Sequence, residues 1–174
     1  MNSLFIVAHP DLKTSIYNQK IVKKLENDLK ISDLKIKKLY DLYPDFQIDV
    51  AQEQHDLLWA DRIIFQFPLY WHNVPALLKQ WQDSVLTFGF AYGAVHQLQG
   101  KKLLLSVTAG SSAPEDVVFE IQEKWSQVFH LLAKFCQIEF EGLVISYGCS
   151  PQLTLEDQEK KVNLHIEKLR KILK

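Results

Sequence analysis

The sequence is poor in cysteine, and it contains no long hydrophobic run. Its two cysteines, Cys136 and Cys149, are not spaced as C-x-x-C and are not accompanied by a histidine pair suited to zinc. This pattern argues against a disulfide framework and predicts no metal site. The apolar run at the amino terminus stops at His9-Pro10, which is too short for a signal peptide or a membrane span. The expected location is therefore the cytoplasm.

Glycine is scarce as well, with six residues, and the glycine-rich motifs that hold phosphate groups are missing. The chain has no G-x-x-x-x-G-K motif and no G-x-G-x-x-G motif. The sequence therefore supports neither a P-loop nucleoside triphosphatase nor a dinucleotide-binding domain of the usual glycine-rich kind.

The chain also lacks a charge excess of either sign, since its formal net charge is -1. Such a balance does not indicate a positively charged surface for binding nucleic acid or an anionic membrane. Two small groups of lysines alternate with apolar residues, which predicts that they form the solvated outer sides of one helix and one strand. They are Lys20, Lys23, Lys24, Lys35, Lys37 and Lys38.

The composition that is present is typical of a globular protein, with 47% apolar and 24% charged residues. A chain of 174 residues fits one domain, residues 1–174, and a domain of that size buries roughly 70% of the surface that its unfolded chain exposes. No repeat, low-complexity tract or Gly/Ser linker divides the sequence. We expect a single domain.

Short apolar runs alternate with longer amphipathic segments along the whole chain. The short runs predict strands at residues 3–8, 34–39, 62–67, 102–107 and 139–146. The amphipathic segments predict helices at residues 15–29, 50–60, 76–86, 115–135 and about 155–173. In the last helix, Thr154 and Asp157 resemble a capping box with aspartate in place of glutamate. Its apolar residues share one face: Leu155, Val162, Ile166, Leu169 and Leu173.

Strict alternation predicts an α/β fold with a parallel sheet between two layers of helices, because parallel strands need crossover connections. Five strands fit the order 2-1-3-4-5, in which strands one and three flank the topological switch point. The loops after strands one, three and four, at residues 9–18, 68–75 and 108–114, are therefore expected to meet at one ligand crevice.

The loop after the third strand presents Tyr70, Trp71 and His72 between two prolines, Pro68 and Pro75. The prolines fix φ at both ends and remove two backbone donors, so the segment between them is expected to be stiff. Flat aromatic groups at the carboxyl end of a strand suit a planar ligand better than a sugar or a phosphate. The alternative is that the aromatic residues are core residues at the end of a strand.

The loop after the first strand is a candidate phosphate site. It leads into a helix whose first turn offers unpaired N–H groups and the positive end of the dipole, and Thr14, Ser15 and Asn18 add short polar side chains. The alternative is that Ser15 or Thr14 only caps the helix and that His9 is a hydrogen-bonded histidine at the end of a strand.

Taken together, these segments resemble the flavin-dependent NAD(P)H:quinone reductase family, in its short bacterial branch with stress-induced quinone reductases and ancillary proteins of potassium efflux systems. The resemblance runs from the first strand to about Gly110. Its matching residues are Ala8-His9-Pro10 with Ser15 and Asn18, Leu42-Tyr43-Pro44-Asp45-Phe46, Phe67-Pro68-Leu69-Tyr70-Trp71 with Pro75 and Leu77-Leu78-Lys79, Gly89-Phe90-Ala91-Tyr92-Gly93, and Thr108 with Gly110.

The resemblance implies a flavodoxin-like three-layer sandwich that binds a flavin. The flavin phosphate would lie at His9, Ser15, Tyr17 and Asn18. The isoalloxazine would lie along Pro68, Leu69, Tyr70 and Trp71, with Thr108, Ala109 and Gly110 as a further part of the cofactor site. FMN is favoured over FAD because the chain has no carboxy-terminal extension of the kind that longer FAD-binding relatives carry.

The resemblance also implies an activity and an assembly. NAD(P)H would deliver hydride to the flavin and leave, and a quinone would then take the hydride in the same pocket, a two-electron ping-pong reaction. Relatives are similar in forming homodimers with the active site at the interface, so residues near Tyr92 would complete the partner's pocket. Trp71, His72 and Tyr92 are the expected substrate-pocket residues. The residues do not distinguish NADH from NADPH.

The chain departs from the family pattern in the loop after the fourth strand. Thr108-Ala109-Gly110-Ser111 replaces Thr-Thr-Gly-Gly, which removes one hydroxyl but keeps a flexible turn at Gly110. The Tyr and His that relatives carry farther along have no counterpart between Ser111 and Lys124. We expect His72 to supply a proton or a hydrogen bond instead, since an imidazole ring can do either. The alternative is that it packs against the flavin or the substrate.

Two other functions remain open. One is a flavin-binding ancillary subunit that regulates a potassium efflux antiporter in the membrane, for which residues 42–46 and the short length argue. The other is a one-electron flavodoxin, which is disfavoured because the Thr/Ser-rich phosphate loop is absent and the aromatic pocket suits a second planar molecule.

Overall fold

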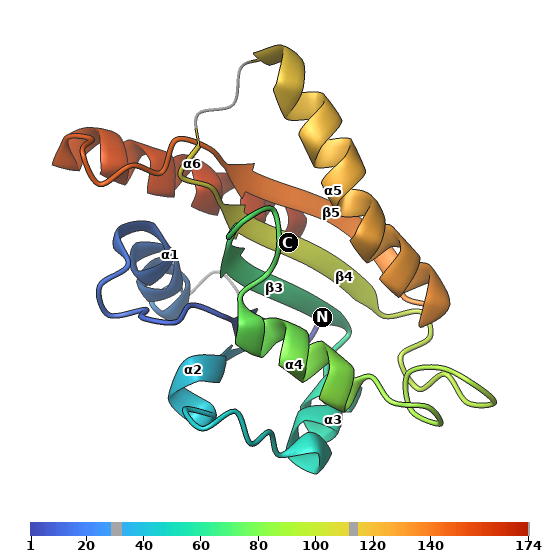
Figure 1. Cartoon of the computed structure of the whole chain (residues 1–174). Coiled ribbons are helices and arrows are strands. Elements are labelled where there is room, and N and C mark those ends of the chain that lie inside the picture. The colour runs from blue at the N-terminus through green and yellow to red at the C-terminus, as the bar shows by residue number, and fades with distance from the viewer. Residues whose placement is uncertain (29–32, 112–114, 174) are drawn as a thin grey trace.

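The computed structural model describes residues 1–28, 33–111 and 115–173 (Figure 1). Five parallel strands form one sheet in the order β2-β1-β3-β4-β5, which confirms the predicted topology. The strands are β1 (Ser3–Val7), β2 (Leu34–Lys38), β3 (Arg62–Pro68), β4 (Lys102–Thr108) and β5 (Glu139–Ser146). The helices are α1 (Ile16–Glu26), α2 (Leu39–Leu42), α3 (Val50–Trp59), α4 (Ala76–Val85), α5 (Glu115–Phe135) and α6 (Leu155–Leu173).

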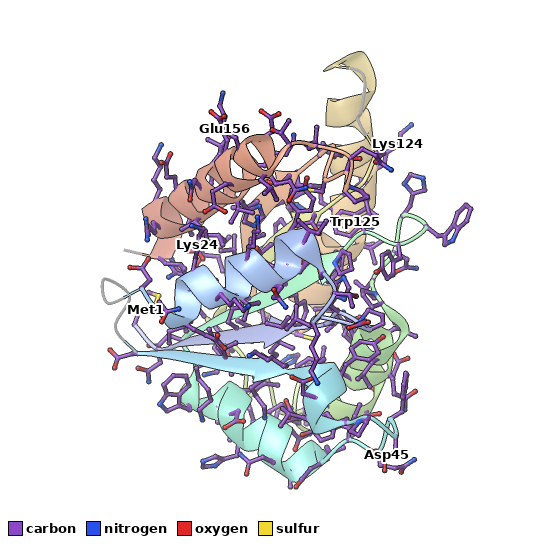
Figure 2. All side chains as sticks on the ribbon, turned by 90° about the vertical axis from the view of Figure 1, so that its left-hand side faces the viewer. Met1, Lys24, Asp45, Lys124, Trp125 and Glu156 are labelled. Carbon is purple, nitrogen blue, oxygen red and sulfur yellow. The ribbon has the colours of Figure 1, made fainter. Side chains whose placement is uncertain are left out.

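Helices cover both faces of the sheet. Figure 2 shows α1, where Lys24 is labelled, and the start of α6, where Glu156 is labelled, on one side of the sheet, with α3 on the other. The side chains agree: Phe5 and Val7 of β1 pack in a cluster with α1 and α6, whereas Leu4 and Ile6 pack in a cluster with α3, α4 and α5. Burial on both faces explains why the strands are continuous apolar runs.

The register of the strands brings four loops to one edge of the sheet. Val7 of β1 pairs with Gln66 of β3, and Gln66 pairs with Ser106 of β4. Pro68, predicted as the first loop residue, instead ends β3 and pairs with Thr108. Parallel strands have their carboxyl ends at the same edge, so the loops after β1, β3, β4 and β5 leave the sheet side by side.

The prediction that all six lysines are solvated is wrong for Lys37. Its side chain is buried, and its Nζ lies 2.5 Å from Glu53 Oε1 and 2.5 Å from Asp56 Oδ2, both on α3. Lys35 also contacts Asp56, at 2.7 Å. Burial opposes ionisation of Asp56, but the hydrogen bonds and charges of the two lysines outweigh it and lower the pKa of its carboxyl. Strand β2 therefore turns two lysines toward α3, and of these Lys37 is buried there.

Glu53 completes this buried cluster, which ties β2 and α3 to α4. The carboxylate is fully buried and accepts a hydrogen bond from Tyr43 Oη at 2.5 Å and one from Trp81 Nε1 at 2.8 Å. Trp81 itself is fully buried and packs edge-on against Phe65, with 5.7 Å between ring centroids. Every oxygen of Glu53 thus has a donor, as a buried charge requires.

Three smaller differences concern the ends of elements. Helix α2, a single turn, was not predicted, and helix α1 ends at Glu26, before Leu29, which lies outside the described residues. Leu155, predicted on the buried stripe of α6, is 78% exposed because it is the first residue of the helix. Thr154 caps the helix as expected, since its Oγ1 accepts from the Asp157 N–H at 3.1 Å. No helix within the described parts of the chain is long and apolar enough to cross a bilayer.

Acid is expected to destabilise the protein through His165 on α6, which is fully buried. Burial, with a smaller contribution from Lys168, lowers its pKa from 6.5 to about 4. The imidazole of His165 is protonated below about pH 6.5 in the unfolded chain, but only below about pH 4 in the native state. The free energy of unfolding therefore falls by about 3 kcal/mol as the pH falls from about 6.5 to about 4, and this contribution is fully present above that range. Urea unfolding at pH 7, 5 and 4 measures this loss.

The matched control for this prediction is His165→Gln, which keeps one donor and one acceptor but does not titrate. The difference in stability between the wild type and this variant should shrink by about 3 kcal/mol from pH 7 to pH 4. A difference that does not change with pH would contradict the prediction.

Candidate functional site

A cavity of about 390 Å³ opens where the loops after β1, β3, β4 and β5 leave the sheet. The cavity is lined by His9, Thr14, Ser15, Ile16, Tyr17, Asn18, Pro68, Leu69, Tyr70, Thr108, Gly110, Cys149 and Pro151. None of these side chains is acidic. The predicted convergence of the loops after β1, β3 and β4 is thus seen for the described residues, although residues 112–114 of the last of them lie outside these.

The amino terminus of α1 forms one end of the cavity. Ser15 is its N-cap, and its Oγ accepts from the Asn18 N–H at 3.3 Å. The first turn carries no acidic residue. The N–H groups of Ile16 and Tyr17 have no acceptor among the backbone contacts of the described residues, as is usual for the first turn of a helix. This end of the cavity therefore favours an anion.

His9 adds a neutral donor at the same end. Its Nδ1 accepts a hydrogen bond from the Asp11 N–H at 3.1 Å, which leaves the ring proton on Nε2. Burial lowers the pKa of the imidazole, although the nearby Asp11 raises it. The ring packs edge-on against Tyr70, with 6.2 Å between centroids. At neutral pH the Nε2–H of His9 can donate without adding a charge.

Asn18 is buried and uses its amide inside the protein. Its Nδ2 donates to Thr108 Oγ1 at 2.9 Å and to Ser15 Oγ at 3.3 Å, and its Oδ1 accepts from Gln66 Nε2 at 2.7 Å. The amide therefore fastens α1 to β3 and β4 and fixes the two hydroxyl groups at the cavity. A direct contact from Asn18 to a phosphate stays a prediction.

Tyr17 and Cys149 form the wall on the side of β5. Tyr17 Oη donates to the Ser150 carbonyl at 2.7 Å, and burial raises the pKa of this phenol. Cys149 Sγ donates to the Ser146 carbonyl at 3.3 Å, and burial raises the pKa of the thiol to about 11. The thiol therefore stays protonated at neutral pH and does not oppose an anion. Cys149 and Pro151 were not predicted, because nothing in the sequence marks the loop after β5.

The aromatic loop after β3 is a tight hairpin turn. Tyr70 and Asn73 exchange backbone hydrogen bonds at 3.0 and 2.9 Å. Trp71 and His72 lie between them with φ of 49° and 57°, as in a type I′ turn. Such backbone costs on the order of 1–3 kcal/mol per non-glycine residue and tends to occur at functional sites.

The turn divides the predicted aromatic residues into two groups. Tyr70, together with Pro68 and Leu69, lines the cavity. Trp71 is 97% exposed at the tip of the turn, and neither it nor His72 is among the lining residues. The core alternative is therefore wrong for Trp71. The roles of Trp71 and His72 with cofactor and substrate stay predictions.

Two further predicted residues lie away from the cavity surface. Ala109 is buried, and its N–H donates to the Ser146 carbonyl at 2.8 Å while its carbonyl accepts from the Cys149 N–H at 2.9 Å. Tyr92 lies in a different hollow, with its ring centroid 4.9 Å from that of Phe135. Within one chain, the structure does not bring Tyr92 to the cavity.

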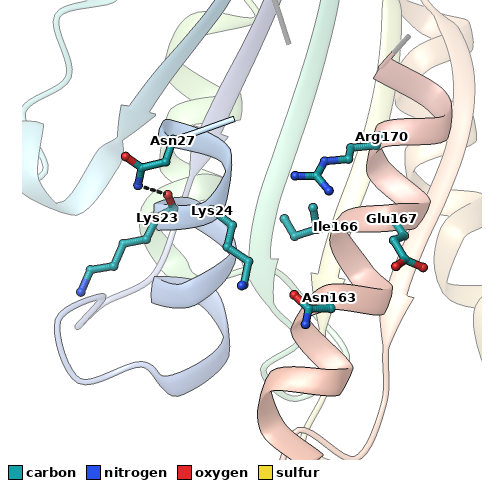
Figure 3. Close-up of a pocket in the computed structure, with 7 residues that line it drawn as sticks. All are labelled: Lys23, Lys24, Asn27, Asn163, Ile166, Glu167 and Arg170. Atoms are coloured by element: carbon teal, nitrogen blue, oxygen red, sulfur yellow. Dashed lines mark hydrogen bonds between the residues drawn. The ribbon is translucent and has the colours of Figure 1, made fainter. Parts of the chain in front are cut away.

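A second cavity of about 390 Å³ lies between α1 and α6 (Figure 3). Lys23, Lys24 and Arg170 give it a basic rim, but Lys24 is paired with Glu159 at 2.5 Å and Arg170 with Asp28 at 2.5 Å. Its lining includes no aromatic side chain. No group of three His, Cys, Asp or Glu residues suited to a metal occurs in the described parts of the chain. The cavity at the strand ends is therefore the candidate site.

Sequence comparison finds relatives for much of the chain. A family model described as flavodoxin-like fold matches residues 1–173. The uncharacterized NAD(P)H oxidoreductase YrkL of Bacillus subtilis is 48% identical over 112 residues, 64% of this chain and 63% of that protein. The glutathione-regulated potassium-efflux system ancillary protein KefF of Enterobacter sp. is 45% identical over 109 residues, 62% of this chain and 60% of that protein. The chain thus spans less than two thirds of the length of these curated relatives.

Two solved structures share the fold over almost the whole chain. General stress protein 14 of Treponema denticola, solved in complex with FMN, has a TM-score of 0.85 and 30% identity and covers 100% of both chains. The NADPH-quinone reductase of P. pentosaceus has a TM-score of 0.77 and 32% identity and covers 95% of both chains. These similarities and the family match agree with the sheet order and with the cavity at the strand ends. The chain therefore belongs to the flavodoxin-like fold family, alongside the flavin-dependent NAD(P)H:quinone reductases that its motifs resemble.

Proposed function

We propose that this protein binds FMN and catalyses the two-electron reduction of quinones by NADH or NADPH. The observation that carries the proposal is the cavity, which has hydrogen-bond donors at the start of α1 and an apolar and aromatic wall along Pro68, Leu69 and Tyr70. The names of the relatives support the same activity, and one solved relative holds FMN.

The residues of the cavity fit a flavin mononucleotide. The amides of Ile16 and Tyr17, the Nε2–H of His9 and the hydroxyls of Ser15 and Thr108 can all donate to a phosphate. No lining side chain opposes the phosphate charge, because none is acidic and Cys149 is protonated. FMN is proposed in preference to FAD, since nothing in this donor group calls for a second phosphate or an adenine.

The chain itself would bind and orient the flavin and the substrates and would exclude water from them. The flavin, when bound, supplies the capacity to accept and release hydride. Tyr70 and Leu69 would hold the ring along the end of β3, and the turn that carries Trp71 and His72 would border the space above it. We propose that NAD(P)H and the quinone use this one space in turn, which gives a ping-pong reaction. His72 is the proposed hydrogen-bond or proton donor to the bound substrate.

We also propose that the active protein is a homodimer. Three apolar side chains on α5 are exposed beside the hollow that contains Tyr92: Val128 at 64%, Leu131 at 67% and Phe135 at 62%. A second subunit that covers this face would bury them and would place Tyr92 at the interface, near the partner's pocket. Sedimentation of the Leu131→Glu variant tests this, because an unchanged mass relative to the wild type would contradict the proposal.

The purified protein is expected to take up FMN and to reduce a simple benzoquinone with NADH or NADPH. Initial rates at several fixed quinone concentrations should give parallel double-reciprocal plots, since the reductant leaves before the quinone binds. Mass spectrometry of the released flavin distinguishes FMN from FAD. A protein that binds neither flavin would overturn the proposal, and intersecting plots would overturn the ping-pong order alone.

A second candidate function follows from the similarity to KefF. In this function the flavin-bound protein associates in the cytoplasm with a potassium efflux antiporter and regulates it, and its reductase activity is incidental. Affinity purification from solubilised membranes that yields no transporter, under conditions in which the protein retains its flavin, would exclude it.

A further inference from the structure

Buried polar side chains form a continuous line through the core, from β5 toward the cavity. His165 of α6 is fully buried, with its Nδ1 2.8 Å from Ser146 Oγ and its Nε2 2.8 Å from Ser106 Oγ. Ser106 Oγ lies 2.5 Å from Gln66 Oε1, and both of these residues are also fully buried. A line of this length inside an apolar core is costly unless every member has a partner.

The line continues to the surface of the cavity. Gln66 Nε2 donates to Asn18 Oδ1 at 2.7 Å. Asn18 Nδ2 in turn donates to Thr108 Oγ1 at 2.9 Å and to Ser15 Oγ at 3.3 Å. Ser15 and Thr108 both line the cavity, so the buried network ends in two hydroxyl groups at the proposed phosphate position.

With the side-chain amides of Gln66 and Asn18 oriented as in the structure, hydrogen-bond chemistry gives the buried part a single direction. An amide oxygen only accepts, so the Ser106 hydroxyl must give its one proton to Gln66 Oε1. Ser106 Oγ can then only accept from His165, which places the ring proton on Nε2. His165 Nδ1 is left as an acceptor for the Ser146 hydroxyl. Donors and acceptors therefore run head to tail from β5 inward.

The same logic fixes the cavity end. The side-chain amide of Asn18 gives both of its protons, one to Thr108 and one to Ser15. The two hydroxyls accept these bonds, so each keeps its own proton for another acceptor. The space beside both hydroxyls is the cavity. They are therefore set as a pair of donors, which suits an anion and does not suit a cation.

We propose that this network orients the hydroxyl protons of Ser15 and Thr108 toward the phosphate of FMN, and that His165 is a positioning residue at its buried end. The identification of the anion as FMN phosphate rests on the proposed function. The direction of the network does not, because it follows from the hydrogen bonds inside the chain.

An anion in the cavity also selects the direction. In the reverse direction, the amides of Asn18 and Gln66 would be turned over and His165 would carry its proton on Nδ1. Ser15 and Thr108 would then donate to Asn18 and present lone pairs to the cavity, which repels an anion. Binding of a phosphate group and the Nε2–H form of His165 are thus linked, each favouring the other.

The first test compares two ligands that differ by the phosphate. FMN and riboflavin are titrated into the apoprotein of the wild type, His165→Leu and His165→Gln, with flavin fluorescence as the readout. We expect His165→Leu to weaken FMN binding about tenfold and riboflavin binding less than about twofold. His165→Gln should bind FMN as the wild type does, because its amide replaces the donor and the acceptor of the ring. If His165→Leu lost equal affinity for FMN and for riboflavin, the proposal would be overturned.

The second test reads the tautomer of His165 directly and requires no variant to fold. Long-range ¹H–¹⁵N spectra of the wild-type protein, with FMN or with inorganic phosphate alone, should show the proton on Nε2. A proton on Nδ1 with either probe would overturn the proposal. Failure of the proposed function would look different, since the protein would then bind neither FMN nor riboflavin while the phosphate spectra still report the direction of the network.

Discussion

Replacing Ser15 by aspartate is expected to weaken FMN binding at least about 1000-fold while leaving the fold unchanged. Aspartate is as good an N-cap as serine, so it would still accept from the Asn18 N–H and stabilise the start of α1. It would remove one donor from the cavity and place a negative charge at the proposed phosphate position. Two like unit charges about 4 Å apart repel by about 4 kcal/mol at an effective dielectric constant of about 20, which corresponds to about 1000-fold in affinity. Fluorescence titration with FMN measures the change.

The matched control is Ser15→Asn, which also caps a helix but carries no charge. It should bind FMN far more tightly than the aspartate variant, and both variants should unfold at temperatures close to that of the wild type. Riboflavin, which lacks the phosphate, should bind all three proteins similarly. If Ser15→Asp binds FMN as tightly as the wild type does, the phosphate lies elsewhere, and the assignment of the phosphate to the start of α1 is wrong.

Lys37→Met is expected to destabilise the protein by about 3–5 kcal/mol. Lys37 Nζ contacts the carboxylates of Glu53 and Asp56, and Glu53 is fully buried. Removing the ammonium group leaves Glu53 without its cation in a site that water does not reach. Methionine keeps most of the length of the side chain, so the loss reports the charge rather than the packing. Equilibrium unfolding in urea at pH 7 gives the value.

Lys35→Met provides the control within the same strand. Lys35 contacts Asp56 as well, but its side chain is 42% exposed, so water replaces the interaction. The net charge of the protein changes by the same amount, yet the expected loss is only about 0–1 kcal/mol. If the two variants were equally stable, the cluster around Glu53 would not depend on a buried cation.

The alternation of strands and helices and the order of the sheet could be predicted, because burial on both faces leaves a continuous apolar run for each strand. The burial of Lys37 could not. It depends on Glu53 and Asp56, which lie on α3 and reach β2 only through the packing of α3 on the sheet. Helix α2 also carries no signal, since a single turn is too short to show a helical period.

The position of the candidate site could be predicted from the switch-point rule, which uses only the order of the strands. The details within it depend on contacts that no local pattern reveals. The prolines around residues 69–74 indicated a stiff loop, but the exchange of hydrogen bonds between Tyr70 and Asn73 turns Trp71 away from the cavity. His165 lies beside Ile166 on the buried face of α6, and the sequence gives no reason to expect a histidine there to meet two serines.

The exposed indole of Trp71 is an intrinsic fluorescent probe of the protein. Of the four tryptophans, Trp81 is fully buried and Trp59 and Trp125 are half-buried, whereas Trp71 is almost entirely in water. Trp71 should therefore dominate the long-wavelength side of the intrinsic emission and the part that iodide quenches. Because it lies at the tip of the turn that begins at Tyr70, this emission reports on the mouth of the cavity even when no coloured ligand is present.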